Sequence, residues 1–269
     1  MFSKLMATRA RENLRLLREK SPLVHCITNN VVMNSTADTL LACGAHAVMA
    51  YAQEEVEEVV SNASALLLNI GTLTLPRFDS MIKAGRRANE RQIPVAFDPV
   101  GAGATKLRTQ ASRKILEDLC LAAIRGNASE ILSLSNKGLK TKGVESSHSV
   151  EQAAAAAQTH ANEFKTIVAI TGEVDLITDG ERTSRVLNGD KLMRTVTGMG
   201  CAATAVIAAF LAVDSDPFTA VTTGLAFFGL AGERAAGIPK GRGSFQFAMM
   251  DALYTLGEIE LEAGARIQF

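Results

Sequence analysis

The sequence predicts a three-layer α/β/α sandwich around a mostly parallel sheet. Short apolar runs, such as residues 65–70 and 94–97, alternate along the chain with longer stretches that place apolar residues at helical spacing. Strands that are apolar at every position are typical of parallel sheets, because helices cover both faces and every side chain is buried. Since no linker divides the 269 residues, we expect a single domain over residues 1–269.

The N-terminal part of the chain alternates between helix and strand. Residues 2–20 carry Leu14 and Leu17 among charged residues, which predicts a surface amphipathic helix rather than a transit peptide. Polar turns, such as residues 28–30, then separate an apolar run from the helix that follows and supply its cap. The expected strands are residues 22–27, 47–50, 65–70 and 94–97, and the expected helices are residues 31–43, 54–61 and a segment opened by Pro76.

The C-terminal part continues this alternation and adds a hairpin. Asp179–Gly180 separates two short runs, 174–178 and 182–187, which is the spacing of an antiparallel pair. The alanine run in residues 150–164 suits close helix packing. Two further strands are expected at residues 122–124 and 166–170, and two loops at residues 135–149 and 237–243. The expected helices are residues 109–121, one opened by 125–130, 150–164, one starting near Gly200, 217–236 and 244–263.

Composition and charge argue against several classes of function. Lys plus Arg number 28 and Asp plus Glu also number 28, so no net charge attracts nucleic acid or an anionic membrane. Aromatic residues make up 5% and Trp is absent, which leaves few stacking platforms for single-stranded nucleic acid. No long uncharged apolar run predicts a membrane span. The four cysteines form no CxxC motif and no secretory signal is visible, so we expect a cytoplasmic protein without disulfides or zinc.

The stretch of residues 195–203, TVTGMGCAA, is the first candidate for chemistry. Gly198 and Gly200 come directly before an Ala- and Leu-rich helical pattern. Backbone N–H groups at such a helix start form an anion site that suits a phosphate. Cys201 would stand at the positive end of this helix, where we expect the thiol to ionise more easily than usual. A glycine-rich turn before a core helix, with a small buried Cys, is the structural alternative.

Polar residues at the ends of the predicted strands suggest a common ligand site. Ligands in parallel sheets bind outside the carboxyl ends of the strands. Asp98 ends one strand and suits a metal-bound phosphate, whereas Arg125 at the end of another suits phosphate directly. Asn127 and Glu130 have the spacing of a capping box, but both could also reach a magnesium–phosphate unit. Helix caps and surface salt bridges are the structural alternatives for these residues.

Several other residues fit the same site less specifically. Thr171–Gly172 and the Asp179–Gly180 turn are places where a nucleotide could lie. Met49 offers an adaptable apolar wall, although core packing is the simpler interpretation. His25 and His46 are expected to be hydrogen-bonded core residues rather than bases. Together the candidates fit phosphoryl transfer, although the Walker A motif GxxxxGK[ST] is absent from the sequence.

Seven motifs, in order, make the chain resemble the hydroxyethylthiazole kinases, which are thiamine-salvage enzymes of the ribokinase-like superfamily. The resemblance covers residues 22–256. The motifs are PLVHCITNNVV from Pro22, GAHAVMA from Gly44, LLLNIGTL from Leu66, DPVGAGAT from Asp98, IRGNASEI from Ile124, AITGEVDLITDG from Ala169 and VTGMGCA from Val196. It implies a ribokinase-like fold and phosphorylation of the hydroxyl of 4-methyl-5-(2-hydroxyethyl)thiazole with ATP and Mg²⁺.

The resemblance also implies a role for individual residues. Those expected to contact the thiazole alcohol are Asn29, Met49 and Gly198. Those expected to contact ATP are Arg125 and Thr171. Those expected in the magnesium and phosphate region are Asp98, Asn127 and Glu130. Cys201 falls where most ribokinase-like kinases have an Asp acting as base, and the family is typically a homotrimer with the thiazole bound between neighbouring subunits.

The chain departs from the family pattern at two places. His46–Ala47 stands where the family often has Ser–Pro, which concerns the fit of the substrate. Residues 241–245 read GRGSF where the family often has GPGSF, which concerns a loop.

Our mechanistic hypothesis is in-line attack of the thiazole alcohol on the γ-phosphate of ATP. The N–H groups of residues 198–201 would hold the developing charge, Mg²⁺ would bridge the phosphates, and Cys201 would position the alcohol or accept its proton. The alternatives are a ribokinase-like kinase for another small alcohol and a ligand-binding module that kept the fold without catalysis. A substrate panel and an assay of ADP release separate the three.

Overall fold

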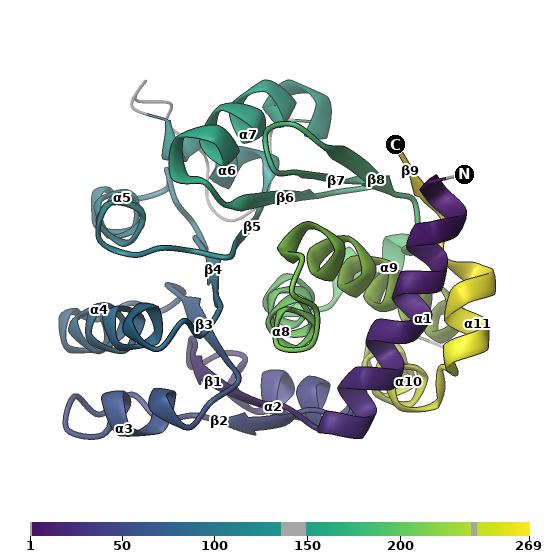
Figure 1. Ribbon diagram of the computed structural model, residues 1–269, viewed down its shortest axis with the longest axis horizontal. Helices are drawn as coiled ribbons and strands as arrows, with labels where there is room; N and C mark the ends of the chain where they lie inside the picture. Colours follow the sequence, from purple (N-terminus) through teal and green to yellow (C-terminus); the bar gives the residue numbers. More distant parts are fainter. Residues whose placement is uncertain (1, 136–148, 238–240) are drawn as a thin grey trace.

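One mixed sheet runs through the molecule (Figure 1). The computed structural model describes residues 2–135, 149–237 and 241–269. Its sheet has nine strands in the order β2-β1-β3-β4-β5-β6-β7-β8-β9. Every pairing from β2 to β6 is parallel, whereas β7, β8 and β9 join in antiparallel pairings. The expected mostly parallel sheet is therefore confirmed. The strands are β1 Leu23–Ile27, β2 His46–Val48, β3 Ala65–Asn69, β4 Val95–Asp98, β5 Ala123–Asn127, β6 Ile167–Thr171, β7 Asp175–Thr178, β8 Thr183–Val186 and β9 Ile267–Gln268.

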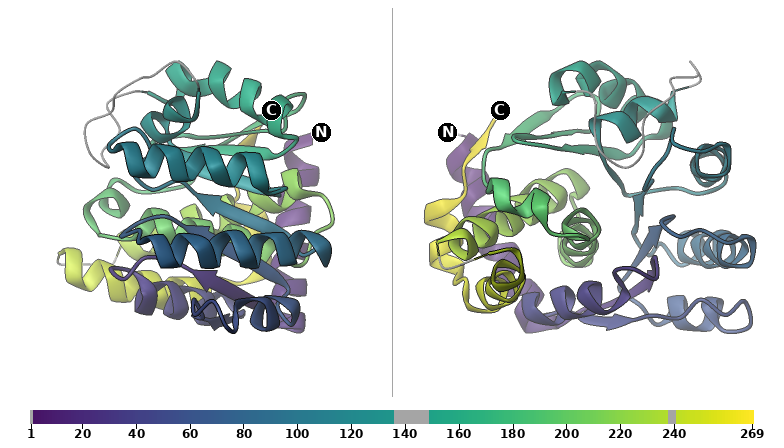
Figure 2. Two further views of the ribbon diagram at one scale, coloured as in Figure 1. Left: turned by 90° about the vertical axis from the view of Figure 1, so that its left-hand side faces the viewer. Right: turned by 180° about the vertical axis from the view of Figure 1, so that it is seen from behind.

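Helices cover both faces of this sheet, as Figures 1 and 2 show. On one face lie α3 Val56–Ser61, α4 Leu75–Glu90, α5 Lys106–Asp118, α6 Ala128–Leu134 and α7 Val150–Phe164. On the other lie α1 Phe2–Lys20, α2 Met33–Cys43, α8 Met199–Leu211, α9 Pro217–Ala236, α10 Arg242–Thr255 and α11 Glu258–Gly264. The molecule is thus a three-layer α/β/α sandwich.

The apolar strands are explained by two hydrophobic cores, one on each side of the sheet. In β3, Leu66 and Leu68 belong to the core under α4 and α5, while Leu67 belongs to the core under α8. All three side chains are completely buried. Because successive side chains of a strand point to opposite faces, a strand covered on both faces must be apolar at every position.

The helix α8 is the centre of the second layer. It packs over β1, β3 and β4 and against α2 and α9. Eleven of its thirteen residues are buried, and only Gly200 and Cys201 in its first turn are partly exposed. A helix that is apolar all round is a buried helix, so the Ala-rich sequence after Cys201 is accounted for by its position.

Some element boundaries differ from the expected ones. The helix expected at 109–121 is α5, which begins at Lys106 because the Thr105 side chain accepts a hydrogen bond from the Arg108 N–H. The helix expected at 244–263 is split into α10 and α11, and the Glu260 carboxylate accepts a hydrogen bond from the Gly257 N–H at the break. The short β9 and the 3₁₀ turn η1 Lys191–Thr195 were not expected.

The predicted hairpin is confirmed as β7 and β8, which are antiparallel neighbours. Gly180 in its turn has φ +98°, a conformation that glycine adopts without strain. Most of the loop expected at 135–149 and part of the loop expected at 237–243 lie outside the described residues.

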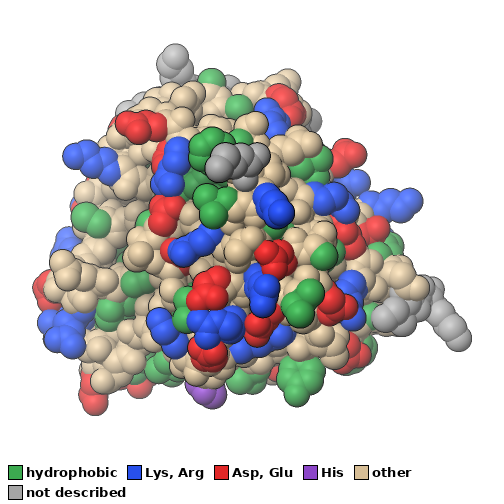
Figure 3. Space-filling model, turned by 45° about the vertical axis from the view of Figure 1, so that its right-hand side comes forward, with side chains coloured by type: hydrophobic (Ala, Val, Ile, Leu, Met, Phe, Trp, Pro, Cys, Tyr) green, Lys and Arg blue, Asp and Glu red, His purple; other side chains and the backbone are tan. Residues whose placement is uncertain are grey.

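The structure can be compared with two expectations from composition, on membrane spans and on charge. None of the helices in the described part of the chain combines the length and apolar character that a membrane span requires. Figure 3 shows Lys and Arg side chains interspersed with Asp and Glu side chains over one face of the molecule. This mixture agrees with the equal numbers of basic and acidic residues. The expectation that nucleic acid is not a partner stays a prediction.

Candidate functional site

The candidate residues gather along one edge of the sheet, at the carboxyl ends of its central strands. Asn69 ends β3 and Asp98 ends β4, and the two are register partners. Asn127 ends β5 and Thr171 ends β6, and these are register partners as well. Asn29 follows β1 by two residues. The carboxyl edge of a parallel sheet is where ligands bind in such folds, and these candidate residues lie together there.

The start of α8 lies at this edge and leaves its first amides uncapped. Gly198 is the N-cap with φ +90°, and no side chain caps the helix. The first intrahelical bond runs from the Ala202 N–H to the Gly198 carbonyl, so the N–H groups of Met199, Gly200 and Cys201 have no partner within the helix. A Cβ on Gly198 would lie 2.7 Å from the Cγ1 of Val32. Both the positive φ and this close contact therefore favour glycine at the turn. The helix start has the form of an anion site.

Arg125 lies against this helix start. Its Nη1 is 3.8 Å from the Asp98 Oδ2, and its Nη2 donates a hydrogen bond to the Thr171 hydroxyl. A Cβ on Gly200 would lie 2.5 Å from the Nη1 of Arg125. Gly200 therefore leaves room for the close approach of the guanidinium, which brings a positive charge to the uncapped amides.

Asp98 is completely buried and has hydrogen bonds on one oxygen. Its Oδ2 accepts bonds from the Asn69 Nδ2 at 2.9 Å and from the Thr204 hydroxyl at 3.0 Å. Its Oδ1 has no partner among the described residues. Burial raises the pKa of Asp98, and the charge of Arg125 and these two hydrogen bonds oppose that rise. One oxygen of this buried carboxyl group is thus held by hydrogen bonds, and the other is buried without a partner among the described residues.

Asn29 and Cys201 meet at the other end of the cluster. The Asn29 Nδ2 lies 3.5 Å from the Cys201 Sγ and donates to the Asn69 Oδ1 at 3.0 Å. Burial, followed by the charge of Asp98, raises the pKa of Cys201 to about 12. The expectation that the helix start makes this thiol easier to ionise is therefore wrong, because loss of solvation outweighs the helix end. Cys201 is a neutral thiol at pH 7.

Glu130 and Asn127 form the capping box that their spacing predicted. The Asn127 side chain accepts from the Glu130 N–H, and the Glu130 Oε2 accepts from the Asn127 N–H. The Glu130 Oε1 also accepts from the Gly101 N–H at 2.8 Å. Burial, followed by the charge of Asp98, raises the pKa of Glu130 to about 7. The charge of Asp98 thus disfavours the ionisation of Glu130, which a nearby cation would relieve.

Met49, His25 and His46 differ in how far they are buried. Met49 follows the edge strand β2, where it is half-buried and packs against the core under α8. His25 is buried, and its Nε2 lies 2.7 Å from the Ala50 carbonyl oxygen, as expected of a core residue. His46, expected in the core, is exposed on β2, because a strand at the edge of the sheet is only partly covered.

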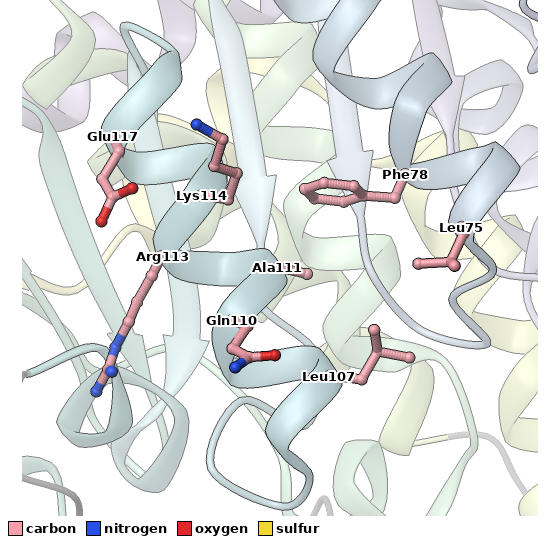
Figure 4. A pocket seen from close by; sticks show the side chains of 8 residues that line it. All are labelled: Leu75, Phe78, Leu107, Gln110, Ala111, Arg113, Lys114 and Glu117. Carbon is pink, nitrogen blue, oxygen red and sulfur yellow. The ribbon is translucent and has the colours of Figure 1, made fainter.

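Figure 4 shows a groove on the described surface that lies away from the candidate residues. All eight residues that line it belong to α4 and α5, among them Leu75, Phe78 and Leu107. The Lys114 ammonium beside it is paired with Asp118. The groove separates the outer helices and contains none of the candidate residues.

Asn69 and Thr204 belong to the cluster but were not among the candidates. Both side chains are completely buried and both donate to the Asp98 carboxylate. Asn69 is the polar end of an otherwise apolar strand, which is the signal that marked Asp98. Thr204 follows Cys201 by three residues and therefore shares its helix face. Both signals were present in the sequence.

Comparisons with known proteins agree with this geometry. The sequence model described as the Hydroxyethylthiazole kinase family matches residues 14–259. The chain is 53% identical to a hydroxyethylthiazole kinase of Desulfotalea psychrophila over 96% of this chain and 95% of the relative. It is 49% identical to that of Thermoanaerobacter pseudethanolicus over 96% and 99%.

Solved structures give the same result. The hydroxyethylthiazole kinase protein of Pyrococcus horikoshii OT3 superposes with a TM-score of 0.89 and 43% identity, covering 96% of this chain and 98% of that one. The pyridoxal kinase of Staphylococcus aureus in complex with AMP-PCP and pyridoxal has a TM-score of 0.56 at 18% identity, with coverage of 77% and 86%. This second likeness shows the ribokinase-like fold alone. The family match and the close relatives show that the chain belongs to the hydroxyethylthiazole kinase family.

Proposed function

We propose that this protein transfers the γ-phosphate of ATP to the hydroxyl of 4-methyl-5-(2-hydroxyethyl)thiazole, giving the thiazole phosphate used in thiamine salvage. Family membership supports the substrate. The observation that carries the reaction type is the uncapped start of α8 beside Arg125. Three free amides and a fixed guanidinium suit the charge that develops on a phosphoryl group in transfer.

The nucleotide and the alcohol would approach this helix start from opposite ends of the cluster. Arg125 and Thr171, which are joined by a hydrogen bond, would contact ATP. Asn29, Met49 and Gly198 would contact the thiazole alcohol. The two ends meet at the first turn of α8, where Gly198 and Gly200 keep the backbone bare. In-line transfer requires this arrangement, because the attacking and leaving oxygens lie on opposite sides of the phosphorus.

Cys201 would position the alcohol rather than accept its proton. Its pKa of about 12 leaves the thiol neutral at pH 7, so a thiolate base is scarce. A neutral thiol beside the Asn29 amide still offers a hydrogen bond to a hydroxyl group. Phosphoryl transfer needs little from a base, since its transition state is largely dissociative.

The carboxyl residues of the cluster suit Mg²⁺, which neutralises phosphate charge when it is bound with ATP. Asp98 has a buried oxygen without a partner among the described residues. Glu130 adds a second carboxylate whose ionisation is disfavoured by Asp98. We propose that Asp98 holds the cation and that Glu130 and Asn127, whose side chains also accept helix amides, act through water. The phosphates of ATP would supply further ligands.

A homotrimer in the cytoplasm is also part of the proposal. All four cysteines are free thiols, which suits a reducing compartment. The neighbouring helices α2 and α10 expose apolar side chains, including Leu41 and Phe247. Val31, which is 66% exposed, follows the candidate Asn29 by only two residues. An apolar surface beginning at the substrate end of the cluster supports a thiazole site between subunits.

An assay of ADP release tests the proposed function. We expect release that depends on both the thiazole alcohol and Mg²⁺, and much slower release with pyridoxal, a pyrimidine alcohol or a sugar. Fast turnover of one of those alcohols instead would assign another substrate to the fold. Binding of ATP and the thiazole alcohol without ADP release would show that the protein is not a kinase.

A further inference from the structure

Two completely buried side chains outside the proposed substrate contacts converge on one oxygen atom. Asn69, at the end of β3, and Thr204, on α8, both donate hydrogen bonds to the Asp98 Oδ2, at 2.9 and 3.0 Å. They come from different layers, one from the sheet and one from the helix layer that covers it. The carboxylate is therefore fixed in rotation, and its Oδ1 is the oxygen left over.

The amide of Asn69 has only one orientation that satisfies its neighbours. Its Oδ1 accepts from the Asn29 Nδ2 and from the Gly71 N–H, both at 3.0 Å. Both partners are donors, so the carbonyl side of the amide must face them and the NH₂ side must face Asp98. A flipped amide would set N–H against N–H on one side and oxygen against carboxylate on the other.

Asn29 is fixed in turn by Asn69. Its Oδ1 accepts from the Val31 N–H at 3.1 Å, and its Nδ2 points toward Asn69 and the Cys201 Sγ. The orientation of Asn29 at the alcohol end is thus held by the Val31 N–H and by Asn69, whose own orientation follows from the charge of Asp98. A continuous directional chain connects the two ends of the site.

Thr204 ties the helix to the same chain. Its hydroxyl has one proton and lies 3.0 Å from the Asp98 Oδ2 and 3.3 Å from the Gly200 carbonyl. The bond to Asp98 joins the second turn of α8, directly after its uncapped amides, to the end of β4. The distance between the anion site and the Asp98 carboxylate is held by this contact.

We propose that Thr204 and Asn69 are positioning residues, which hold Asp98 and the start of α8 in register and, through Asn69 alone, also hold Asn29 at the alcohol end. This inference rests on the proposed function. It predicts different kinetic effects for the two residues, because Thr204 contacts only the phosphate end whereas Asn69 contacts both ends.

Thr204→Val and Thr204→Ser form a matched pair. Valine keeps the shape and loses the proton, and serine keeps the proton. We expect kcat of Thr204→Val to fall about 10- to 100-fold, the range for removing a hydrogen bond to a charged group. The Kd of Thr204→Val for the thiazole alcohol, measured by calorimetry, should stay within about threefold of the wild-type value. The kcat of Thr204→Ser should also stay within about threefold of the wild-type value. Asn69→Ala should instead lower kcat and also weaken binding of the thiazole alcohol.

The double variant Asn69→Ala/Thr204→Val provides the second measurement. Since both bonds end on one oxygen, its loss of kcat should be smaller than the product of the two single losses. Thermal unfolding of each variant shows that it is folded, and Thr204→Ala replaces Thr204→Val if the latter is not. Wild-type kcat in Thr204→Val, or equal losses in the Val and Ser variants, would overturn the inference alone. A wild-type protein inactive toward the thiazole alcohol would overturn the proposed function and this inference together.

Discussion

The position of Cys201 at a helix start predicts a lowered pKa, but burial raises the pKa of this thiol instead. We therefore expect Cys201→Ala to lower kcat about tenfold, which is the loss of one hydrogen bond, and to leave binding of the thiazole alcohol nearly unchanged. Steady-state kinetics and calorimetry check this. Cys201→Ser is the control, since it keeps a donor.

Two results would contradict this role for Cys201. An unchanged kcat in Cys201→Ala would remove the side chain from the mechanism. A loss of kcat near the upper limit of general-base catalysis, about 10⁴-fold, would instead show that the thiolate accepts the proton.

Asp175 predicts a pH dependence of stability. Burial raises the pKa of Asp175 to about 7, although the Gly172 N–H donates to its Oδ1. The unfolded chain loses this proton at lower pH than the folded protein, so the contribution of Asp175 to stability is present in acid and lost as pH rises from about 4 through 7. Asp175→Asn keeps the hydrogen bond and removes the charge. As the pH rises from about 5 to 8, the unfolding free energy of the wild type should fall. We expect the fall in Asp175→Asn to be smaller by about 1–2 kcal/mol.

Urea unfolding at both pH values measures this difference. An identical pH dependence in the wild type and in Asp175→Asn would show that Asp175 is ionised in the folded protein without cost.

Single residues at the carboxyl edge of the sheet could be predicted from the sequence, but their partners could not. The position of Asp98 follows from an apolar strand that ends in a charge. That Asn69 and Thr204 share one of its oxygens depends on the rotation of α8 above β3 and β4, which is set by packing over many residues. The expectation of a lowered pKa for Cys201 was wrong for the same reason, because the burial of the thiol depends on how the layers pack.

At the scale of the element, the N-terminus of α8 depends on one glycine. Gly198→Ala would place a Cβ 2.7 Å from Val32 in a backbone with φ +90°. We expect this variant to lose about 1–2 kcal/mol of unfolding free energy and to bind ATP at least tenfold more weakly, because the uncapped amides move. Chemical denaturation and calorimetry with ATP measure the two effects.

The double variant Gly198→Ala/Val32→Ala separates the backbone strain at residue 198 from the steric clash with Val32. It removes the methyl group that a new Cβ would meet and leaves the left-handed backbone conformation. We expect it to remain weaker in ATP binding than Val32→Ala alone. If ATP binding returned fully, the collision and not the conformation would be the cause.

Element boundaries were predictable where local chemistry sets them. The capping box at Asn127 and Glu130 and the turn at Gly180 are encoded within a few residues. The short β9 was not predictable, because its two residues are strand only through their pairing with Arg185 and Val186, far away in the chain. The break before α11 was missed because the apolar helical pattern continues across Gly257.

At the scale of the whole molecule, the sandwich could be predicted because strands and helices differ in pattern throughout. Leu66, Leu67 and Leu68 supply both hydrophobic cores from consecutive positions, and only a sheet covered on both faces permits this. Assembly is different, because an apolar side chain on the surface looks the same in sequence as one in the core. Phe245 and Phe247 lie two residues apart in α10, yet Phe247 is 76% exposed and Phe245 is completely buried.

The proposed homotrimer would place that exposed surface between subunits. We expect the wild type to have a mass three times the 28.5 kDa of the chain by light scattering. Phe247→Asp would place a charge in the proposed apolar contact between subunits, so we expect it to dissociate the trimer. Ile259→Asp is the matched control, since Ile259 on α11 is 72% exposed but lies outside α2 and α10.

Activity distinguishes a shared site from simple association. If the thiazole alcohol binds between subunits, Phe247→Asp should lose turnover in parallel with the trimer and recover it at protein concentrations that restore assembly. Ile259→Asp should keep both mass and turnover. A monomeric variant with wild-type kinetics would show that each chain holds a complete site, and a monomeric wild type would show that the exposed apolar side chains of α2 and α10 serve another contact.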